Sequence, residues 1–194
     1  KDEHKLCDLL SKHLKKYDLV VVNDFGHELF TNKIIKIIIK NSKFLALNVQ
    51  TNSANIPFNP VTKFKKANFV SIDIPEAKIA TGSKHLPKLE MFNEILKKSK
   101  FNQMVFTEGK KGSWYFKNKK AINTPTFNQN VVDTMGAGDA FFAISSLVMK
   151  KTNNIKLACL LGNIAGALKV SIEGHSKSIN KNDFLKYLKT LIIS

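Results

Sequence analysis

A turn of small residues stands between two carboxylates in the stretch VVDTMGAGDAFFA, residues 131–143. Gly136, Ala137 and Gly138 form the turn, Asp133 precedes it and Asp139 follows it. An apolar run comes directly afterwards, so we expect a helix to begin here. The start of a helix offers unpaired backbone N–H groups and the positive end of its dipole, and glycine lets that backbone approach a bound group closely. The turn therefore predicts a site for an anion such as a phosphate group.

Asp139 gives this turn a second chemical property. A carboxylate beside a bound phosphate is electrostatically unfavourable unless it has a role in the reaction. The role that fits is that of a general base, which takes the proton from a hydroxyl group that attacks phosphorus. The alternative is a plain helix start, at which the helix dipole stabilises Asp139 without any chemistry. A bare Gly-x-Gly-Asp pattern by itself favours that alternative.

The complete string is longer and resembles a known family signature. DTMGAGD is similar to the carboxyl-terminal motif of the ribokinase-like (PfkB) carbohydrate kinases, Asp-Thr-x-Gly-Ala-Gly-Asp. The resemblance implies that Asp139 is the catalytic base and that the backbone of residues 136–138 forms an anion hole for the transferred phosphoryl group. It also implies ATP and Mg²⁺ as cofactors, with a monovalent cation such as K⁺ near Asp133.

Asp73 and Glu76 are candidates for organising the metal. They stand three residues apart in DIPEA, at a predicted strand end and helix start. The family has Asn-x-x-Glu at this place and uses it to organise magnesium and phosphates through water. Asp73 replaces the asparagine here, which adds a negative charge around the metal. For Glu76 alone the alternative is an acidic residue in a first helical turn, stabilised by the dipole.

Two further segments resemble the parts of the family that contact the nucleotide. TEGKKGSWYF is similar to a Thr-x-Gly-x-x-Gly segment whose turn lies along the nucleotide, and the matching residues are Thr107, Gly109 and Gly112. GNIAGALKVSIEGH is similar to the helix and loop that close over adenine, where Asn163 and Gly174 match best. The alternatives are a plain hairpin turn for the first segment and close helix packing for the small residues of the second.

Two other stretches are more specific within the family. VVNDFGHELFT and LNVQTNSAN are similar to the sugar-kinase part of heptose-type kinases, in which an Asp-Tyr-Gly-like turn follows a strand. Asp24 is the matching residue and a candidate for contact with substrate hydroxyl groups, and Asn48 and Gln50 are weaker candidates. His27 and His85 stay outside the catalytic set, because a lone histidine is more often structural or solvated.

Strands alternate with helices along the chain, which predicts an α/β fold with a mostly parallel sheet covered by helices. The expected strands span 18–24, 43–49, 67–73 and 102–109, a hairpin spans 112–125, and the expected helices span 4–16, 31–41, 89–99, 137–150, 154–171 and 181–191, with a further helix that begins around Pro75. Asp24, Asn48, Asp73 and Thr107 stand at carboxyl ends of strands, where ligands bind in such sheets. The fold class that the resemblance implies is the ribokinase-like three-layer α/β/α architecture.

The composition excludes several classes of partner. The formal net charge is +16, but all 31 basic residues are lysine and they are spread along the chain, whereas contacts to phosphate and guanine favour arginine. We therefore expect no nucleic acid partner. The apolar runs are too short to cross a bilayer, and no signal peptide is visible, so we expect a cytoplasmic protein without a membrane partner. Cys7 and Cys159 make neither a disulfide framework nor a zinc site, and Cys159 is expected in the core.

The resemblance spans about residues 18–180 of the 194. The family's amino-terminal strands, the Gly-Gly region that binds the sugar and the small β lid have no counterpart in this sequence. We interpret residues 1–194 as the carboxyl-terminal nucleotide-binding portion of a single kinase domain, incomplete as an enzyme by itself. A sheet without its first strands would expose an edge, which allows a homodimer.

Together these observations predict an ATP-dependent phosphotransferase. It would move the γ-phosphate to a hydroxyl group of a sugar or sugar phosphate, with a heptose as a candidate. One alternative is a kinase of a non-sugar alcohol, such as a nucleoside or a vitamin precursor. Another is a catalytically silent nucleotide-binding module, against which the retention of Asp139 argues.

Overall fold

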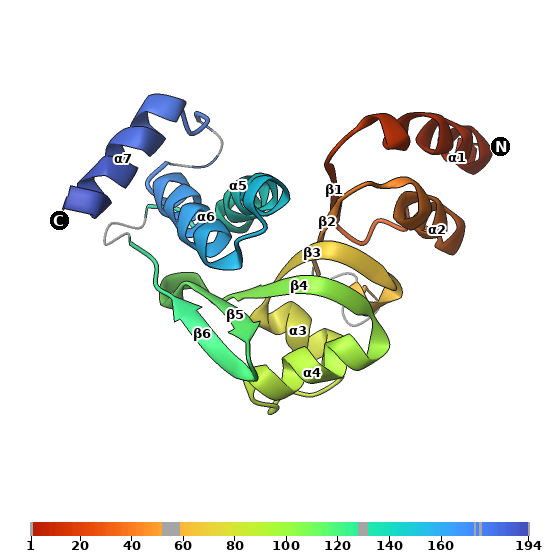
Figure 1. The fold of residues 1–194 in the computed structure, drawn as a ribbon, viewed down its shortest axis with the longest axis horizontal. Coiled ribbons are helices and arrows are strands. Elements are labelled where there is room, and N and C mark those ends of the chain that lie inside the picture. Colours follow the sequence, from red (N-terminus) through yellow and green to blue (C-terminus); the bar gives the residue numbers. More distant parts are fainter. Residues whose placement is uncertain (1, 52–58, 128–131, 173, 175, 194) are drawn as a thin grey trace. The chain divides into compact units, whose positions relative to one another are not determined.

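The computed structural model describes residues 2–51, 59–127, 132–172, 174 and 176–193. The helices are α1 (Asp2–His13), α2 (Asn32–Asn41), α3 (Ile74–Thr81), α4 (Lys88–Lys98), α5 (Ala137–Thr152), α6 (Ile155–Val170) and α7 (Lys181–Ile193) (Figure 1). The strands are β1 (Val20–Asp24), β2 (Leu45–Val49), β3 (Lys66–Asp73), β4 (Lys100–Thr107), β5 (Ser113–Lys117) and β6 (Lys120–Thr124). Short 3₁₀ helices are η1 (Leu14–Lys16), η2 (Val61–Lys63) and η3 (Gly109–Lys111).

The strands of the described chain belong to one six-stranded sheet in the order β1-β2-β3-β4-β5-β6. β1 runs parallel to β2, with Asp24 opposite Val49, and β2 runs parallel to β3. Each strand thus neighbours the next one in the sequence. The predicted alternation of parallel strands and helices is confirmed, and the observed elements follow the expected ranges closely.

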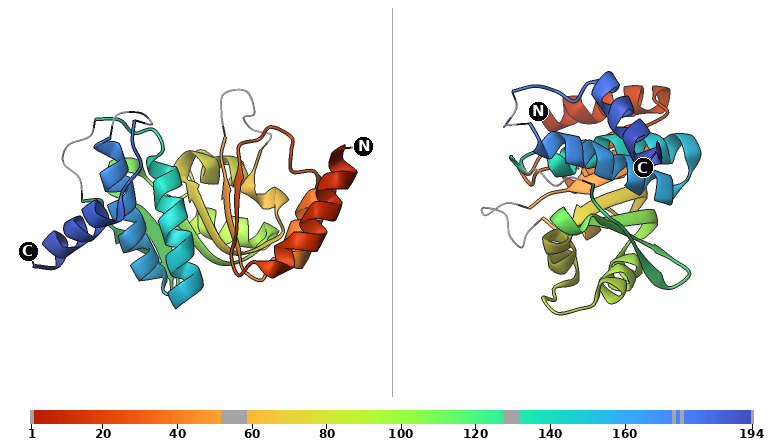
Figure 2. Two further views of the ribbon diagram at one scale, coloured as in Figure 1. Left: turned by 90° about the horizontal axis from the view of Figure 1, so that it is seen from above. Right: turned by 90° about the vertical axis from the view of Figure 1, so that its left-hand side faces the viewer.

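The chain forms two compact units. The first contains Lys1–Phe106 and Phe116–Ala121, and the second contains Thr107–Tyr115 and Ile122–Ser194. In the first unit α1, α2, α3 and α4 lie on the same face of the curved strands (Figures 1 and 2). Every residue of β2 is buried. Phe64, Phe69 and Phe106 are among the fully buried side chains of the first unit.

Local signals in the sequence set the helix ends of the first unit. Thr31 caps α2, and its hydroxyl oxygen accepts a hydrogen bond from Ile34 N at 3.4 Å. Asp73 caps α3, Pro75 follows in the first turn, and Gly82 ends the helix with a φ of 74°. The expected helix over 31–41 and the expected helix start around Pro75 are confirmed. The polar end of β3, at Asp73, is therefore held by the start of α3.

Close packing of two helices dominates the second unit. A Cβ atom at Gly162 on α6 would lie 2.7 Å from the Phe141 ring on α5, so only glycine lets these helices approach this closely. Cys159 on the same helix is fully buried, as expected. Asn118 and Lys119, both with positive φ, form the turn of the predicted hairpin between β5 and β6.

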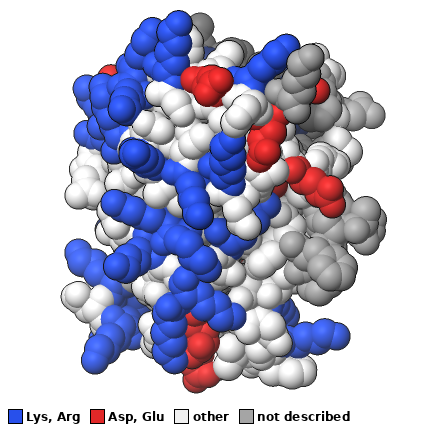
Figure 3. Space-filling view, turned by 90° about the vertical axis from the view of Figure 1, so that its right-hand side faces the viewer, with Lys and Arg blue, Asp and Glu red and all other residues white. Residues whose placement is uncertain are grey.

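Lysine side chains are spread over the face seen in Figure 3, with few acidic side chains among them. This matches a dispersed basic surface better than a single basic patch. Among the described residues, none of the helices combines the length and the apolarity that a membrane span requires.

Candidate active site

The turn before α5 is preformed in the second unit. Gly136 caps the helix with a left-handed φ of 76°, a conformation that favours glycine. Asp133 Oδ1 accepts a hydrogen bond from Met135 N at 2.9 Å, which fixes the chain on the way into the turn. A Cβ atom at Gly138 would meet no heavy atom within 4 Å, and Asp139 is exposed in the first turn of the helix. Ala137 and Gly138 therefore present the start of α5 to open space, as an anion site requires.

A second segment is bound to this turn. Val132 N and Asp133 N donate to Val170 O at 2.8 and 3.1 Å, and Gly174 N donates to Asp133 Oδ2 at 2.9 Å. Gly174, predicted from the resemblance as a nucleotide residue, is thus brought next to Asp133. Glu173 and His175, which flank it in that segment, lie outside the described residues.

Lys169 lies beneath the same turn, and sequence reasoning missed it. The side chain is buried, with 8% exposure, and its Nζ donates a hydrogen bond to Gly174 O. Its Cε is 3.2 Å from the position that a Cβ atom at Gly136 would take, and its Nζ is 4.0 Å from that position. One signal was present in the sequence: a charged residue within the apolar stretch GALKV, in the last turn of α6.

The predicted nucleotide turn after β4 has two different glycines. Thr107 ends β4 and is half-buried, and Gly109 follows with a φ of 50° and open space around the position of a Cβ atom. At Gly112 a Cβ atom would lie 2.2 Å from Thr124 O. Gly112 therefore has a packing role that the resemblance does not include, whereas Gly109 leaves room for a ligand.

Asn163 points into the unit. Its Nδ2 donates to Thr124 O at 2.8 Å and to Pro125 O at 3.0 Å, and the residue is buried. The side chain thus anchors the segment that follows β6. Contact of Asn163 with a nucleotide stays a prediction.

Asp73 and Glu76 form a reciprocal pair in the first unit. Glu76 N donates to Asp73 Oδ1 at 2.7 Å, and Asp73 N donates to Glu76 Oε2 at 2.7 Å. This is a capping box, so the pair starts α3 whatever else it does. Glu76 is buried and Asp73 is half-buried.

The charges of this pair are in an unfavourable environment. Burial, followed by repulsion from Asp73, raises the pKa of Glu76 to about 8. Burial also raises the pKa of Asp73 above its ordinary value, although its hydrogen bonds with Glu76 oppose the change. Two neighbouring carboxylates with raised pKa values fit a divalent cation, because Mg²⁺ is usually bound through one or two carboxylates together with water and phosphate oxygens. Asp73 and Glu76 therefore fit the predicted magnesium role.

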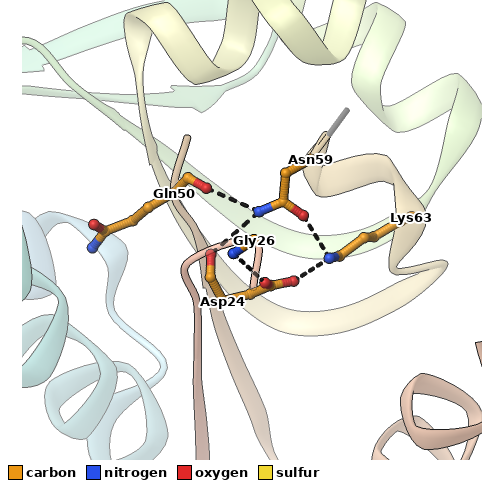
Figure 4. Close-up of polar contacts among 5 residues, drawn as sticks. All are labelled: Asp24, Gly26, Gln50, Asn59 and Lys63. Atoms are coloured by element: carbon orange, nitrogen blue, oxygen red, sulfur yellow. Dashed lines mark hydrogen bonds and ion pairs between the residues drawn. The ribbon is translucent and has the colours of Figure 1, made fainter. Parts of the chain in front are cut away.

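Asp24 lies in a cluster of polar groups at the end of β1. Figure 4 shows its carboxylate between the backbone of Gly26 and the side chain of Lys63. Oδ1 accepts a hydrogen bond from Gly26 N at 2.9 Å, and Oδ2 forms an ion pair with Lys63 Nζ. Asn59 completes the cluster, since its Oδ1 accepts from Lys63 Nζ at 2.5 Å and its Nδ2 donates to Gln50 O at 2.9 Å. The Asp24 carboxylate is buried, and both of its oxygens are engaged within the protein.

Asn48, the weaker substrate candidate, keeps an open acceptor. Its Nδ2 donates to Ser71 O at 2.7 Å, whereas its buried Oδ1 has no hydrogen-bond partner among the described residues. A buried acceptor without a partner costs free energy, which a ligand hydroxyl group would recover. Residues 52–55 of the LNVQTNSAN stretch lie outside the described residues.

Known proteins of similar sequence are longer than this chain. Bifunctional protein HldE of Nitratiruptor sp. is 24% identical over 201 residues, which cover 96% of this chain and 42% of that protein. Bifunctional protein HldE of Campylobacter jejuni (strain 81116) is 28% identical over 199 residues, which cover 97% of this chain and 42% of that protein. The chain thus spans less than half the length of these curated relatives.

Solved structures agree on the fold. Arabidopsis thaliana ribokinase complexed with ribose and ATP has a TM-score of 0.75 at 21% identity, over 94% of this chain and 59% of that one. Escherichia coli phosphofructokinase-2 in complex with potassium has a TM-score of 0.78 at 14% identity, over 98% of this chain and 62% of that one. These likenesses confirm the ribokinase-like three-layer α/β architecture. The family described as pfkB family carbohydrate kinase matches residues 10–182. The chain therefore belongs to the pfkB family of carbohydrate kinases.

Proposed function

We propose that this chain is the nucleotide-binding portion, residues 1–194, of a single kinase domain that transfers the γ-phosphate of ATP to a hydroxyl group of a sugar or sugar phosphate. The observation that carries the proposal is the turn before α5, in which Gly136 is left-handed, Gly138 faces open space and Asp139 stands in the first helical turn. A heptose is the first candidate acceptor, because the turn after β1 resembles that of heptose-type kinases.

The proposed chemistry assigns a role to each part of this turn. Asp139 takes the proton of the acceptor hydroxyl as that oxygen attacks the γ-phosphorus. The backbone N–H groups of residues 136–138 stabilise the charge that develops on the phosphoryl oxygens. Asp73 and Glu76 would hold Mg²⁺ and its waters, and the ion would neutralise phosphate charge during transfer.

Asp139 provides the sharpest test of this proposal in the complete enzyme. Asp139→Asn keeps the shape of the side chain but removes the base, so we expect turnover to fall by roughly a hundredfold or more. The Kd for ATP should stay unchanged or become slightly lower, because a negative charge near the phosphates is lost. Calorimetry with ATP and Mg²⁺ gives the Kd, and release of ADP gives the turnover.

Gly138→Val is the contrasting variant. A valine side chain would fill the open space at the helix start, so ATP affinity and turnover should fall together. Wild-type turnover in Asp139→Asn would show that Asp139 only stabilises the helix start. A complete enzyme that binds ATP but phosphorylates no acceptor in a panel of sugars, heptose phosphates, nucleosides and vitamin precursors would favour a silent nucleotide-binding module.

A further inference from the structure

Lys169 is an unusual residue for the inside of a helix pair. Lysine is rarely buried unless its ammonium is paired. Here 8% of the residue is exposed, and Nζ is directed to the carbonyl oxygen of Gly174. A lysine in the last turn of a helix often interacts with the helix dipole at the surface. Lys169 instead extends into the unit, toward the turn that begins α5.

The peptide groups around this ammonium connect it to the candidate anion site. Both backbone polar groups of Gly174 form hydrogen bonds. Its N–H donates to Asp133 Oδ2, and its carbonyl oxygen accepts from Lys169 Nζ. The Lys169 side chain also passes under Gly136, with Nζ 4.0 Å from the position that a Cβ atom there would take. One positive charge thus lies between the carbonyl of Gly174 and the turn at residues 133–136.

A free monovalent cation does not fit beside this side chain. Carbonyl oxygens bind K⁺ by replacing its water shell. The family resemblance places such an ion near Asp133, but the carbonyl of Gly174 already accepts from the Lys169 ammonium. A second positive charge at this distance would be repelled by the first.

We propose that the ammonium of Lys169 is a built-in cation of the α5 turn and takes the place of a free monovalent ion. An ammonium group carries the same charge as K⁺ and also binds carbonyl oxygens, but the chain fixes its position. Its charge adds to that of the α5 dipole and favours an anion at the turn. The identity of that anion as a transferred phosphoryl group rests on the proposed function, whereas the cation role does not.

The first test needs no nucleotide. The Tm of the chain is measured in KCl, NaCl and choline chloride at equal ionic strength. We expect the three values for the wild type to agree. Lys169→Ala leaves space for a small cation, so its Tm should rise by about 3 °C in KCl or methylammonium chloride relative to choline chloride. Lys156→Ala, which removes an exposed lysine from the same helix, should show no such difference.

Two results would overturn the proposal: a wild type that K⁺ stabilises more than choline does, or a Lys169→Ala variant that responds to no small cation. The wild-type measurement remains decisive if that variant does not fold. In the complete enzyme, wild-type turnover should be equal in K⁺ and choline. Lys169→Met, which keeps the packing under Gly136 but removes the charge, should lower ATP affinity roughly tenfold. If no ATP binds to the wild type, the proposed function fails while the cation test still stands.

Discussion

Two strand ends in the first unit carry carboxylates with opposite surroundings. At the end of β1, the Asp24 carboxylate has an ion pair with Lys63 and a hydrogen bond from Gly26 N. At the end of β3, Asp73 and Glu76 share a capping box, and neither has an ion pair with a cationic side chain in the described part of the chain. A carboxylate with its own lysine has its charge satisfied by the protein. A buried pair without one is a place where an external cation gains the most.

The comparison changes the ranking of the sequence candidates. The resemblance treats Asp24 as a substrate residue and Asp73 and Glu76 as metal residues. Asp73 and Glu76 fit the second assignment, which stays a prediction, and the bonds of Asp24 stabilise the cluster of Figure 4. Contact of Asp24 with substrate hydroxyl groups stays a prediction.

The largest expected effect comes from removing the buried ion pair between Lys63 and Asp24. Lys63→Met should lower the free energy of unfolding by about 3–5 kcal/mol, because it leaves the Asp24 carboxylate buried without its cation. Denaturant unfolding of the chain measures the change. Adding Asp24→Asn to the variant should restore part of the lost free energy of unfolding. The matched control is Lys43→Met, which removes the exposed ion pair with Asp18 and should cost less than about 1 kcal/mol. Equal costs for the two lysines would contradict the buried-pair interpretation.

The Asp73–Glu76 pair should make the stability of the protein depend on pH. The folded pKa of Glu76, about 8, lies above its ordinary value of 4.5, so the folded state holds a proton that the unfolded state releases. Stability from this group is therefore fully present below about pH 4.5 and is lost as the pH rises through about 8. Glu76→Gln should flatten the curve in this range and make the protein more stable than the wild type at pH 8. Glu90→Gln, at an exposed first-turn acid of α4, should leave the curve unchanged. A wild-type curve that is flat between pH 5 and 8 would refute the raised pKa.

The smallest effect is the response of that site to magnesium. Because Mg²⁺ and the proton compete for the same carboxylates, Mg²⁺ should stabilise the chain more at pH 8 than at pH 6. At ten times its Kd the expected gain is about 1.4 kcal/mol, and Glu76→Gln should abolish it. Thermal unfolding with MgCl₂, compared with NaCl at equal ionic strength, measures the effect. An identical gain in Glu76→Gln would mean that magnesium binds elsewhere.

Most of the fold could be predicted from the sequence because its signals are local. The buried β2 run, the cap at Thr31 and the Pro75 helix start each depend on residues within their own segment. The family motif likewise identified the α5 turn, because its seven residues stand together in the chain.

The contacts that tune the site could not be predicted in the same way. Lys63 is one of 31 lysines, and nothing in its sequence neighbourhood indicates that its partner is Asp24. Lys169 stands out as a charge in an apolar stretch, but the sequence does not show that its side chain binds the Gly174 carbonyl. Gly112 was assigned to a nucleotide turn, whereas its need for glycine also comes from the approach of Thr124 O, a contact that only the folded hairpin creates. The raised pKa of Glu76 depends on how deeply α3 is buried, which periodicity does not quantify.

The strand order has a consequence for how the first unit assembles during synthesis. Since β1, β2 and β3 lie in the sheet in the order in which they leave the ribosome, each new strand finds its partner already made and closes only one crossover segment. Among β1, β2 and β3 none has to wait for a distant partner, which limits the loop-closure entropy of each step and the time that an unpaired edge is exposed. A sheet of this order can grow strand by strand from the amino-terminal side, with β2 as the template for β3.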